Sequence, residues 1–297
     1  MASSTSLNPG DANRLFLEAY VSGFQTYSPK YPYIFSERVP QRVDEKFGVT
    51  ASGGYIPSVA EGAAFPQVDI TQVGTKTYSQ VSYKEALPIT TLMKAFDNYG
   101  VVIEEASKQG YRARLTMDKV GAEVLNNAFT SETTWDGAYL YSASHSIGQT
   151  GSTQSNLVTG QLTESTLNTA ITNLRNMKDH NNQVMGLTPK TLVVAPAFAK
   201  KAFELTASQG SPESANRNSN FFNTLGLNVV VWEQLSDSDS FFVMADKMFT
   251  YFRYLVGIAP KMEFIRRPET GNQEYQCEFA VTAGCPDYLG TFGSSGV

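Results

Sequence analysis

The longest helical pattern in the sequence covers residues 98–129, and it limits the possible folds more than any other feature. Small and apolar residues recur at intervals of three or four and form one stripe of a helix, while the opposite side carries charges of both signs. At the rise of an α-helix the segment would be roughly 48 Å long, whereas a globular helix typically has about 11–12 residues. We therefore expect this helix to lie across a broad sheet rather than inside a compact core. The stripe comprises Tyr99, Ile103, Ala106, Gly110, Ala113, Met117, Val120, Val124 and Ala128.

Three glycines lie within this helical pattern. Gly100, Gly110 and Gly121 each weaken a helix by up to ~1 kcal/mol relative to alanine. One alternative is a pair of helices broken at Gly110, and another is a long surface helix without a further role. A single straight helix would need tertiary or partner contacts to stabilise it.

The composition indicates a surface suited to contact with other protein. The 297 residues suffice for one elaborate domain or two modest ones. Only 17% of them are charged, and neutral polar residues replace the missing charges. This favours extensive protein interfaces, because charges are depleted from interface centres. The net charge of −5 argues against strong wrapping of nucleic acid, although weak contact with DNA packed nearby remains compatible with it.

Few residues are available for metal or disulfide chemistry. Cys277 and Cys285 form neither a disulfide framework nor a zinc pattern, and we expect two buried free thiols, as suits a reducing cytoplasm. Only His145 and His180 could supply imidazole. The first ten residues lack a secretory signal, and no apolar run approaches the ~18 residues of a membrane span. No membrane association is therefore expected.

The N-terminal part predicts an arm. Residues 1–9 are rich in serine and asparagine and are expected to be disordered or arm-like. Residues 11–24 predict an amphipathic helix with Asp11 as its N-cap. Prolines interleave with aromatic residues over residues 29–40, which predicts an extended segment lying along another surface.

A long hairpin is predicted to follow the arm. Its rising strand covers residues 49–56, its turn residues 59–67, and its falling strand runs from Val68 to Tyr83. An isolated two-stranded hairpin is marginal in water, and this one is too polar to form a core. It either packs on its own domain as an ordinary edge hairpin or extends and is stabilised by a neighbouring chain.

The second half of the chain predicts a compact α/β unit followed by returning strands. Thr163 or Ser165 is expected to cap its first helix, and Pro196 stands where the first turn of the next helix belongs. The last strands need a sheet and the long helix needs a sheet to cover, so we expect these strands to return beneath the helix. The predicted strands cover residues 135–145, 191–195, 227–232, 241–246, 262–265 and 274–283, and the predicted loops residues 146–160 and 208–220.

Enzymatic alternatives find little support. Ser144 and His145 with Asp136 could suggest a hydrolase, but no G-x-S-x-G turn surrounds the serine. Residues 73–77 (VGTKT) share a glycine and a lysine with a phosphate-binding loop, but the first glycine of that loop is missing. We predict no catalytic, cofactor-binding or metal-ligating residue, no cofactor, and a protein that is not an enzyme.

The order of these parts resembles the major capsid (major head) proteins of tailed phages with the α+β fold of the Hong Kong 97 type. The segment VAEG at 59–62, with Pro66 and DIT at 69–71, resembles the extended loop of that family. Two further segments are similar to the head proteins of Mu-type phages: DG at 136–137 with LYS at 140–142 and His145, and LTPKTLVVAP at 187–196. The resemblance covers residues 47–292.

The resemblance implies a structural subunit that assembles through pentamers and hexamers into an icosahedral head around the DNA genome. The expected partners are further copies of the chain, a portal, a separate scaffolding protein, decoration proteins and the packaged DNA, which it would contact weakly and without specificity. The expected location is the virion capsid, assembled in the host cytoplasm. The nearest rival is the shell protein of an encapsulin-like nanocompartment, and a soluble small-molecule enzyme is a more distant one.

The resemblance also implies a division of the chain. The expected parts are an N-terminal arm (1–46), an extended loop (47–88), a peripheral domain with the spine helix (89–161), an axial domain (162–254) and C-terminal strands that return to the peripheral domain (255–297). Some relatives crosslink through a lysine near the loop tip, but residues 58–67 contain none, so no crosslink is expected.

Overall fold

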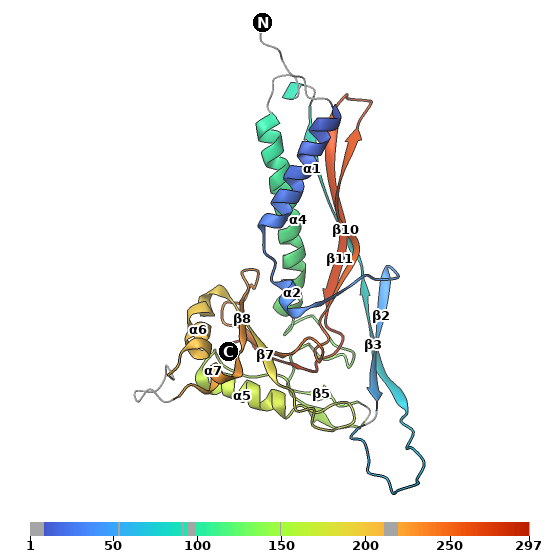
Figure 1. The fold of residues 1–297 in the computed structure, drawn as a ribbon, viewed down its shortest axis with the longest axis vertical. Coiled ribbons are helices and arrows are strands. Elements are labelled where there is room, and N and C mark those ends of the chain that lie inside the picture. The colour runs from blue at the N-terminus through green and yellow to red at the C-terminus, as the bar shows by residue number, and fades with distance from the viewer. Residues whose placement is uncertain are drawn as a thin grey trace.

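The computed structural model describes residues 9–52, 54–90, 92–93, 99–148, 150–210 and 219–296. Figure 1 shows a tall part in which two helices lie beside long strands, a compact unit at its foot, and a hairpin that descends along one side. The tall part contains a sheet of order β1-β10-β11-β4, and the compact unit a sheet of order β12-β9-β7-β8. The mixed α+β architecture agrees with the sequence.

The predicted long helix is a single α-helix, α4 (Tyr99–Asn126), which continues through Gly110. The predicted first residue, Asn98, lies outside the described residues, and the helix ends three residues before Phe129. A side chain at Gly110 would meet the backbone oxygen of Tyr20 at 2.0 Å. Gly110 therefore allows close contact between α4 and the first helix instead of breaking α4.

Helix α1 (Pro9–Thr26) and the sheet both pack on α4. Strand β11 (Gln273–Gly284) pairs with β10 (Arg253–Arg266) on one side and β4 (Val81–Ile89) on the other, both antiparallel. The main core cluster lies where α4, these strands and the compact unit meet. The prediction that late strands return beside the long helix is confirmed for β10 and β11.

The N-terminal segment differs from the prediction in two places. Asp11 lies inside α1 rather than at its N-cap, because the helix already includes Pro9. Part of the segment expected to be extended forms a short helix, α2 (Tyr31–Ile34), with a proline in its first turn. It continues into β1 (Ser36–Arg38), which pairs with β10.

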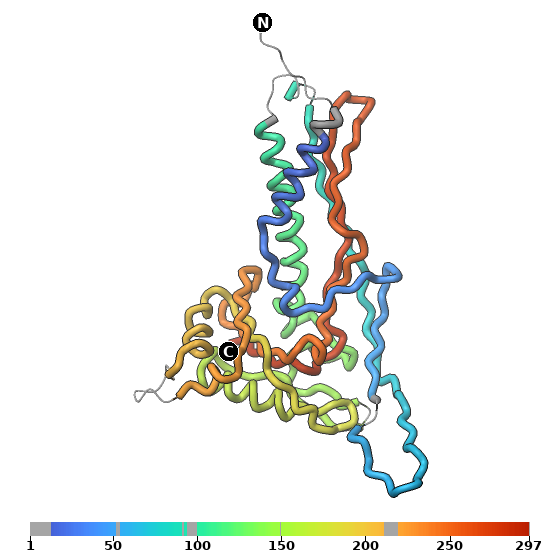
Figure 2. Tube along the Cα trace, viewed as in Figure 1, coloured from blue at the N-terminus to red at the C-terminus, as the bar shows by residue number. Residues whose placement is uncertain are grey.

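The structure contains the predicted hairpin, but its second strand is shorter than predicted. Strands β2 (Asp44–Ser52) and β3 (Ile70–Ser79) pair antiparallel. The predicted falling strand runs to Tyr83, but β3 ends at Ser79. After Gln80 the chain enters β4, which belongs to the sheet of the tall part. Figure 2 shows the connection between β2 and β3 as a long loop that projects away from the rest of the chain.

The compact unit follows the predicted order of elements. Thr163 caps α5 (Glu164–Arg175) through a reciprocal capping box with Thr166. The apolar faces of its helices and strands share one core cluster. The remaining elements are β7 (Pro189–Val194), the 3-10 helix η1 (Pro196–Phe198), α6 (Ala199–Ala207), α7 (Phe221–Leu225), β8 (Asn228–Val231) and β9 (Phe241–Ala245).

Two further expectations need correction. The final strand β12 (Thr291–Ser294) pairs with β9 in the compact unit, so the end of the chain does not return to the tall part as predicted. Residues 135–144 form turns and bends rather than a strand. His145 begins the short strand β5 (His145–Ser146), which pairs with β6 (Thr153–Gln154) inside the predicted loop 146–160. Much of the predicted loop 208–220, residues 211–218, lies outside the described residues.

Within the described part of the chain, no helix combines the length and the apolarity that a membrane span requires.

Candidate functional site

The loop between β2 and β3, residues 54–69, carries apolar side chains that the chain itself does not cover. Ile56 is 96% exposed and Phe65 is 93% exposed. Exposing large apolar side chains to water costs free energy that burial would recover, at roughly 25 cal/mol per Å². A cluster of this kind indicates a protein interface. The other exposed large apolar side chains of the loop are those of Tyr55, Val59 and Val68.

Only the start of this loop contacts the compact unit through described hydrogen bonds. The backbone N–H of Tyr55 donates to Oε1 of Gln183 at 2.6 Å, and the Tyr55 hydroxyl donates to the carbonyl oxygen of Val184 at 3.0 Å. Both partners belong to the turn that follows α5. These bonds hold the beginning of the loop near the compact unit.

The strands of the hairpin, which carry the loop, contact the segment that follows α4. The Nζ of Lys76 donates to the Thr133 hydroxyl at 2.6 Å, and the Tyr78 hydroxyl donates to Oε1 of Glu132 at 3.0 Å. Burial raises the pKa values of both Tyr78 and Glu132. Lys76, which the sequence placed in a possible phosphate loop, thus binds a threonine on its own chain, and β3 leads into another strand rather than a helix.

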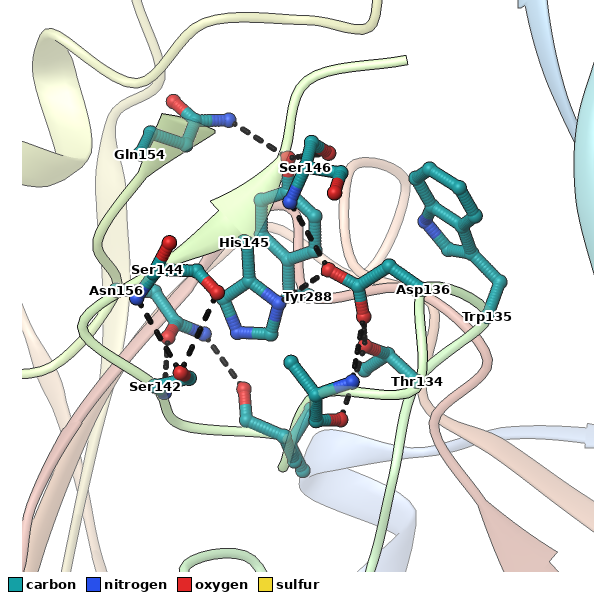
Figure 3. A network of polar contacts seen from close by, with 12 residues as sticks. Thr134, Trp135, Asp136, Ser142, Ser144, His145, Ser146, Gln154, Asn156 and Tyr288 are labelled. Atoms are coloured by element: carbon teal, nitrogen blue, oxygen red, sulfur yellow. Dashed lines mark hydrogen bonds and ion pairs between the residues drawn. The ribbon is translucent and has the colours of Figure 1, made fainter. Parts of the chain in front are cut away.

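A cluster of two histidines and two aspartates lies beside this segment. Figure 3 shows one of its two pairs, Asp136 with His145, and Tyr288 beside that pair. The Nδ1 of His145 lies 2.9 Å from Oδ2 of Asp136, and the Nε2 of His180 lies 2.8 Å from Oδ2 of Asp287. The Tyr288 ring stacks on His145 with centroids 4.0 Å apart. All four members of the two pairs have almost fully buried side chains.

The electrostatics of this cluster favour a structural role. Burial alone would raise the pKa of Asp136, but hydrogen bonds from His145, Thr134 and the backbone N–H of Ser146 outweigh it and lower this pKa to about 2. The carboxylate is therefore charged and fully occupied by local donors. It joins the turn of residues 134–138 to residues 145–146, and neither of its oxygens is directed at solvent.

The structure joins two of the three residues of the conceivable hydrolase. Asp136 and His145 form a pair, but the Nε2 of His145 is buried without a hydrogen-bond partner among the described residues, so the Ser144 hydroxyl does not contact it. The ring is 0% exposed, which leaves no route for a substrate. The described residues also contain no group of three or more His, Cys, Asp or Glu side chains able to hold a metal.

A second buried junction centres on Asp118 of α4. Its carboxylate accepts hydrogen bonds from the Tyr27 hydroxyl, the backbone N–H groups of Lys30 and Tyr31, and Nε1 of Trp232, at 2.6–3.0 Å. One side chain thus joins the N-terminal segment, the long helix and the compact unit. Sequence reasoning missed this junction, because Asp118 reads as one more charge on the solvated side of the helix.

Comparisons with known proteins agree on one class of protein. A family model described as phage capsid protein matches residues 72–293. The asymmetric unit of the mature capsid of bacteriophage PhiM1 shares the fold with a TM-score of 0.59 and 11% identity, covering 90% of this chain and 87% of that chain. No curated protein sequence matches.

Two further solved structures share the fold. The procapsid of bacteriophage JBD30 aligns with a TM-score of 0.55 and 10% identity, over 97% of this chain and 76% of that one. A virus-like particle from Pyrococcus furiosus aligns with a TM-score of 0.54 and 11% identity, over 95% of this chain and 98% of that one.

Proposed function

Because this chain belongs to the phage capsid protein family, we propose that its copies join into closed shells through the loop of residues 54–69. The chain is a structural capsid subunit and its place is the virion capsid. The exposed apolar residues of the loop carry the proposal, since Ile56 and Phe65 have no cover within their own chain. A neighbouring copy would bury them as part of an obligate interface of about 2,000–5,000 Å².

The proposed assembly is geometric and requires no chemistry. Heterologous contacts between identical subunits close into rings, and we assign rings of five and six copies to this chain. The shell would follow the Hong Kong 97 type, and its subunits would resemble those of Mu-type heads. Membership of a phage capsid family does not favour the nanocompartment alternative.

The proposed division of labour follows the observed elements. Residues 1–46 would act as the arm and residues 47–80 as the extended loop. The spine helix α4 with β4, β10 and β11 would form the peripheral domain, and residues 162–252 with β12 the axial domain. The capsid would further require a portal, a separate scaffolding protein and weak contact with packaged DNA, and it could bind decoration proteins.

Size-exclusion chromatography with electron microscopy tests the proposal. The wild-type chain should elute as capsomers or megadalton shells rather than at 32.5 kDa. Replacing Ile56 and Phe65 by serine should leave a folded subunit and lower the yield of closed shells at least about tenfold, equivalent to ~1.4 kcal/mol of contact energy.

The control changes two exposed alanines of the same loop, Ala60 and Ala64, to serine. This removes little apolar area and should preserve assembly. Closed shells in normal yield from the Ile56→Ser/Phe65→Ser chain would show that the loop does not join the copies.

A further inference from the structure

One face of β3 lies on the segment that follows α4, residues 132–135, which we call the docking segment. Alternate residues of a strand point to the same face, and here Gly74, Lys76 and Tyr78 form that face. Lys76 bonds to Thr133 and Tyr78 bonds to Glu132. Gly74 lies against the remaining contact, Trp135.

The pairing register of the hairpin shifts beside Gly74. Val49 of β2 pairs with Gly74, but the next residue, Thr50, pairs with Gln72. Val73 is therefore an extra residue on β3, which is a β-bulge. A bulge bends its strand and increases the local twist. The bend lies between the docked part of the hairpin and the loop of residues 54–69, so it sets the direction in which the loop leaves the body.

The Trp135 indole fills the space in which a side chain at Gly74 would lie. A Cβ atom there would come within 2.5 Å of Cε3 of Trp135, closer than real contacts allow. Two hydrogen bonds fix Trp135. Its indole Nε1 donates to Oδ1 of Asp287 at 3.3 Å, and its backbone N–H donates to the Pro286 carbonyl oxygen at 3.1 Å. Asp287 in turn pairs with His180 in the compact unit.

We propose that Trp135 is a positioning residue for assembly: its indole, packed against Gly74 at the bulge, aims the loop of residues 54–69 at the neighbouring copy. A loop held in its bound direction before contact loses less conformational freedom on binding, so the contact is tighter. This inference rests on the proposed role of the loop. It adds the residue that sets the loop's direction and the path by which the compact unit fixes it.

The test uses a clash and its relief in the full-length chain. Gly74→Ala introduces one methyl group against the indole and should redirect the loop, lowering the yield of closed shells at least about tenfold. Gly48→Ala is the matched control on the same hairpin, because among the described residues a Cβ there would meet only the Gln72 side chain, at 3.9 Å. Gly74→Ala combined with Trp135→Leu replaces the clash by a contact between the added methyl group and the smaller leucine side chain, and it should recover part of the lost yield.

A distance measurement separates positioning from general damage. Fluorescent labels on Ser58→Cys in the loop and Lys200→Cys in the compact unit react selectively, because both native cysteines are buried. The distance between the two labels within one subunit should change in Gly74→Ala and stay unchanged in Gly48→Ala. It should return towards the wild-type value in the double variant.

The outcomes are distinguishable. If Gly74→Ala assembles normally, or if it loses assembly while the label distance stays unchanged, Trp135 does not position the loop. If Gly74→Ala does not fold, Trp135→Leu alone decides, since it adds no atoms: a changed distance with fewer shells supports the inference, and wild-type values for both overturn it. Failure of the wild-type chain to form shells would instead overturn the proposed function.

Discussion

The indole Nε1 of Trp232 donates a hydrogen bond of 2.8 Å to Oδ2 of Asp118 and so joins the compact unit to the long helix. The same carboxylate accepts two backbone N–H groups from the N-terminal segment. A buried carboxylate without a cationic partner is stable only when donors of this kind satisfy it. Asp118 therefore helps to fix the position of the compact unit relative to α4, together with the core cluster that the two share.

Asp118→Asn should destabilise the subunit by about 2–3 kcal/mol, because the amide keeps one acceptor oxygen and turns its NH₂ group towards N–H groups of the backbone or of Trp232, which can only donate. The measurement is urea unfolding of assembly-deficient subunits at neutral pH. Glu123→Gln on the same helix is the control: its side chain is half exposed and should change the free energy of unfolding by less than ~0.5 kcal/mol. Equal effects of the two changes would contradict the structural role of Asp118.

Two glycines of α4 should respond to alanine with opposite signs. At Gly110 the added Cβ would collide with the backbone of α1, so Gly110→Ala should lower the stability although alanine is the better helix former. At Gly100 no atom of the described residues lies within 4 Å, and Gly100→Ala should raise the stability by up to ~1 kcal/mol. Thermal unfolding of the two variants measures the contrast. A stabilising Gly110→Ala would show that α1 does not pack closely on the helix.

Gly110 shows which part of the fold the sequence could predict and which part it could not. Periodicity gave the long helix and its apolar stripe, since both are local properties. Whether Gly110 breaks the helix depends on α1, some ninety residues earlier in the chain, and no local pattern contains that contact. The helix at Tyr31–Ile34 was missed for a similar reason, because burial against α4 outweighs the extended preference of a proline-rich segment.

The candidate site divides in the same way. The exposed loop could be predicted, because its lack of a core is a property of its own composition. The pair His180–Asp287 could not, since its members lie 107 residues apart. His145 and Asp136 are close enough in sequence to be considered together, but only the fold shows that the pair is buried. The contact of Gly74 with Trp135 leaves just a weak trace, a glycine in an alternating strand.

Asp136 should make the stability depend on pH in a defined window. Its pKa falls from the ordinary 3.8 to about 2 in the folded chain, so the carboxylate stabilises the fold above about pH 4 and this contribution disappears as the pH falls through about 2. Asp136→Asn should cost on the order of 2 kcal/mol at pH 7. The difference from the wild type should narrow between pH 4 and pH 2, as measured by chemical unfolding. A difference that stays constant over this range would contradict the assignment.

The two cysteines should be unreactive in the folded subunit. Both are buried free thiols, as the sequence predicted. Burial raises the pKa of Cys277 and, more strongly, that of Cys285, and only the thiolate reacts with alkylating agents. At pH 8 a thiol reagent should therefore modify neither residue until denaturant is added, whereas the exposed Ser58→Cys variant should react at once and serves as the positive control. Rapid labelling of Cys285 in the native chain would mean that the end of β11 opens, and that the packing of Tyr78 beside it, on which the docked hairpin depends, is transient.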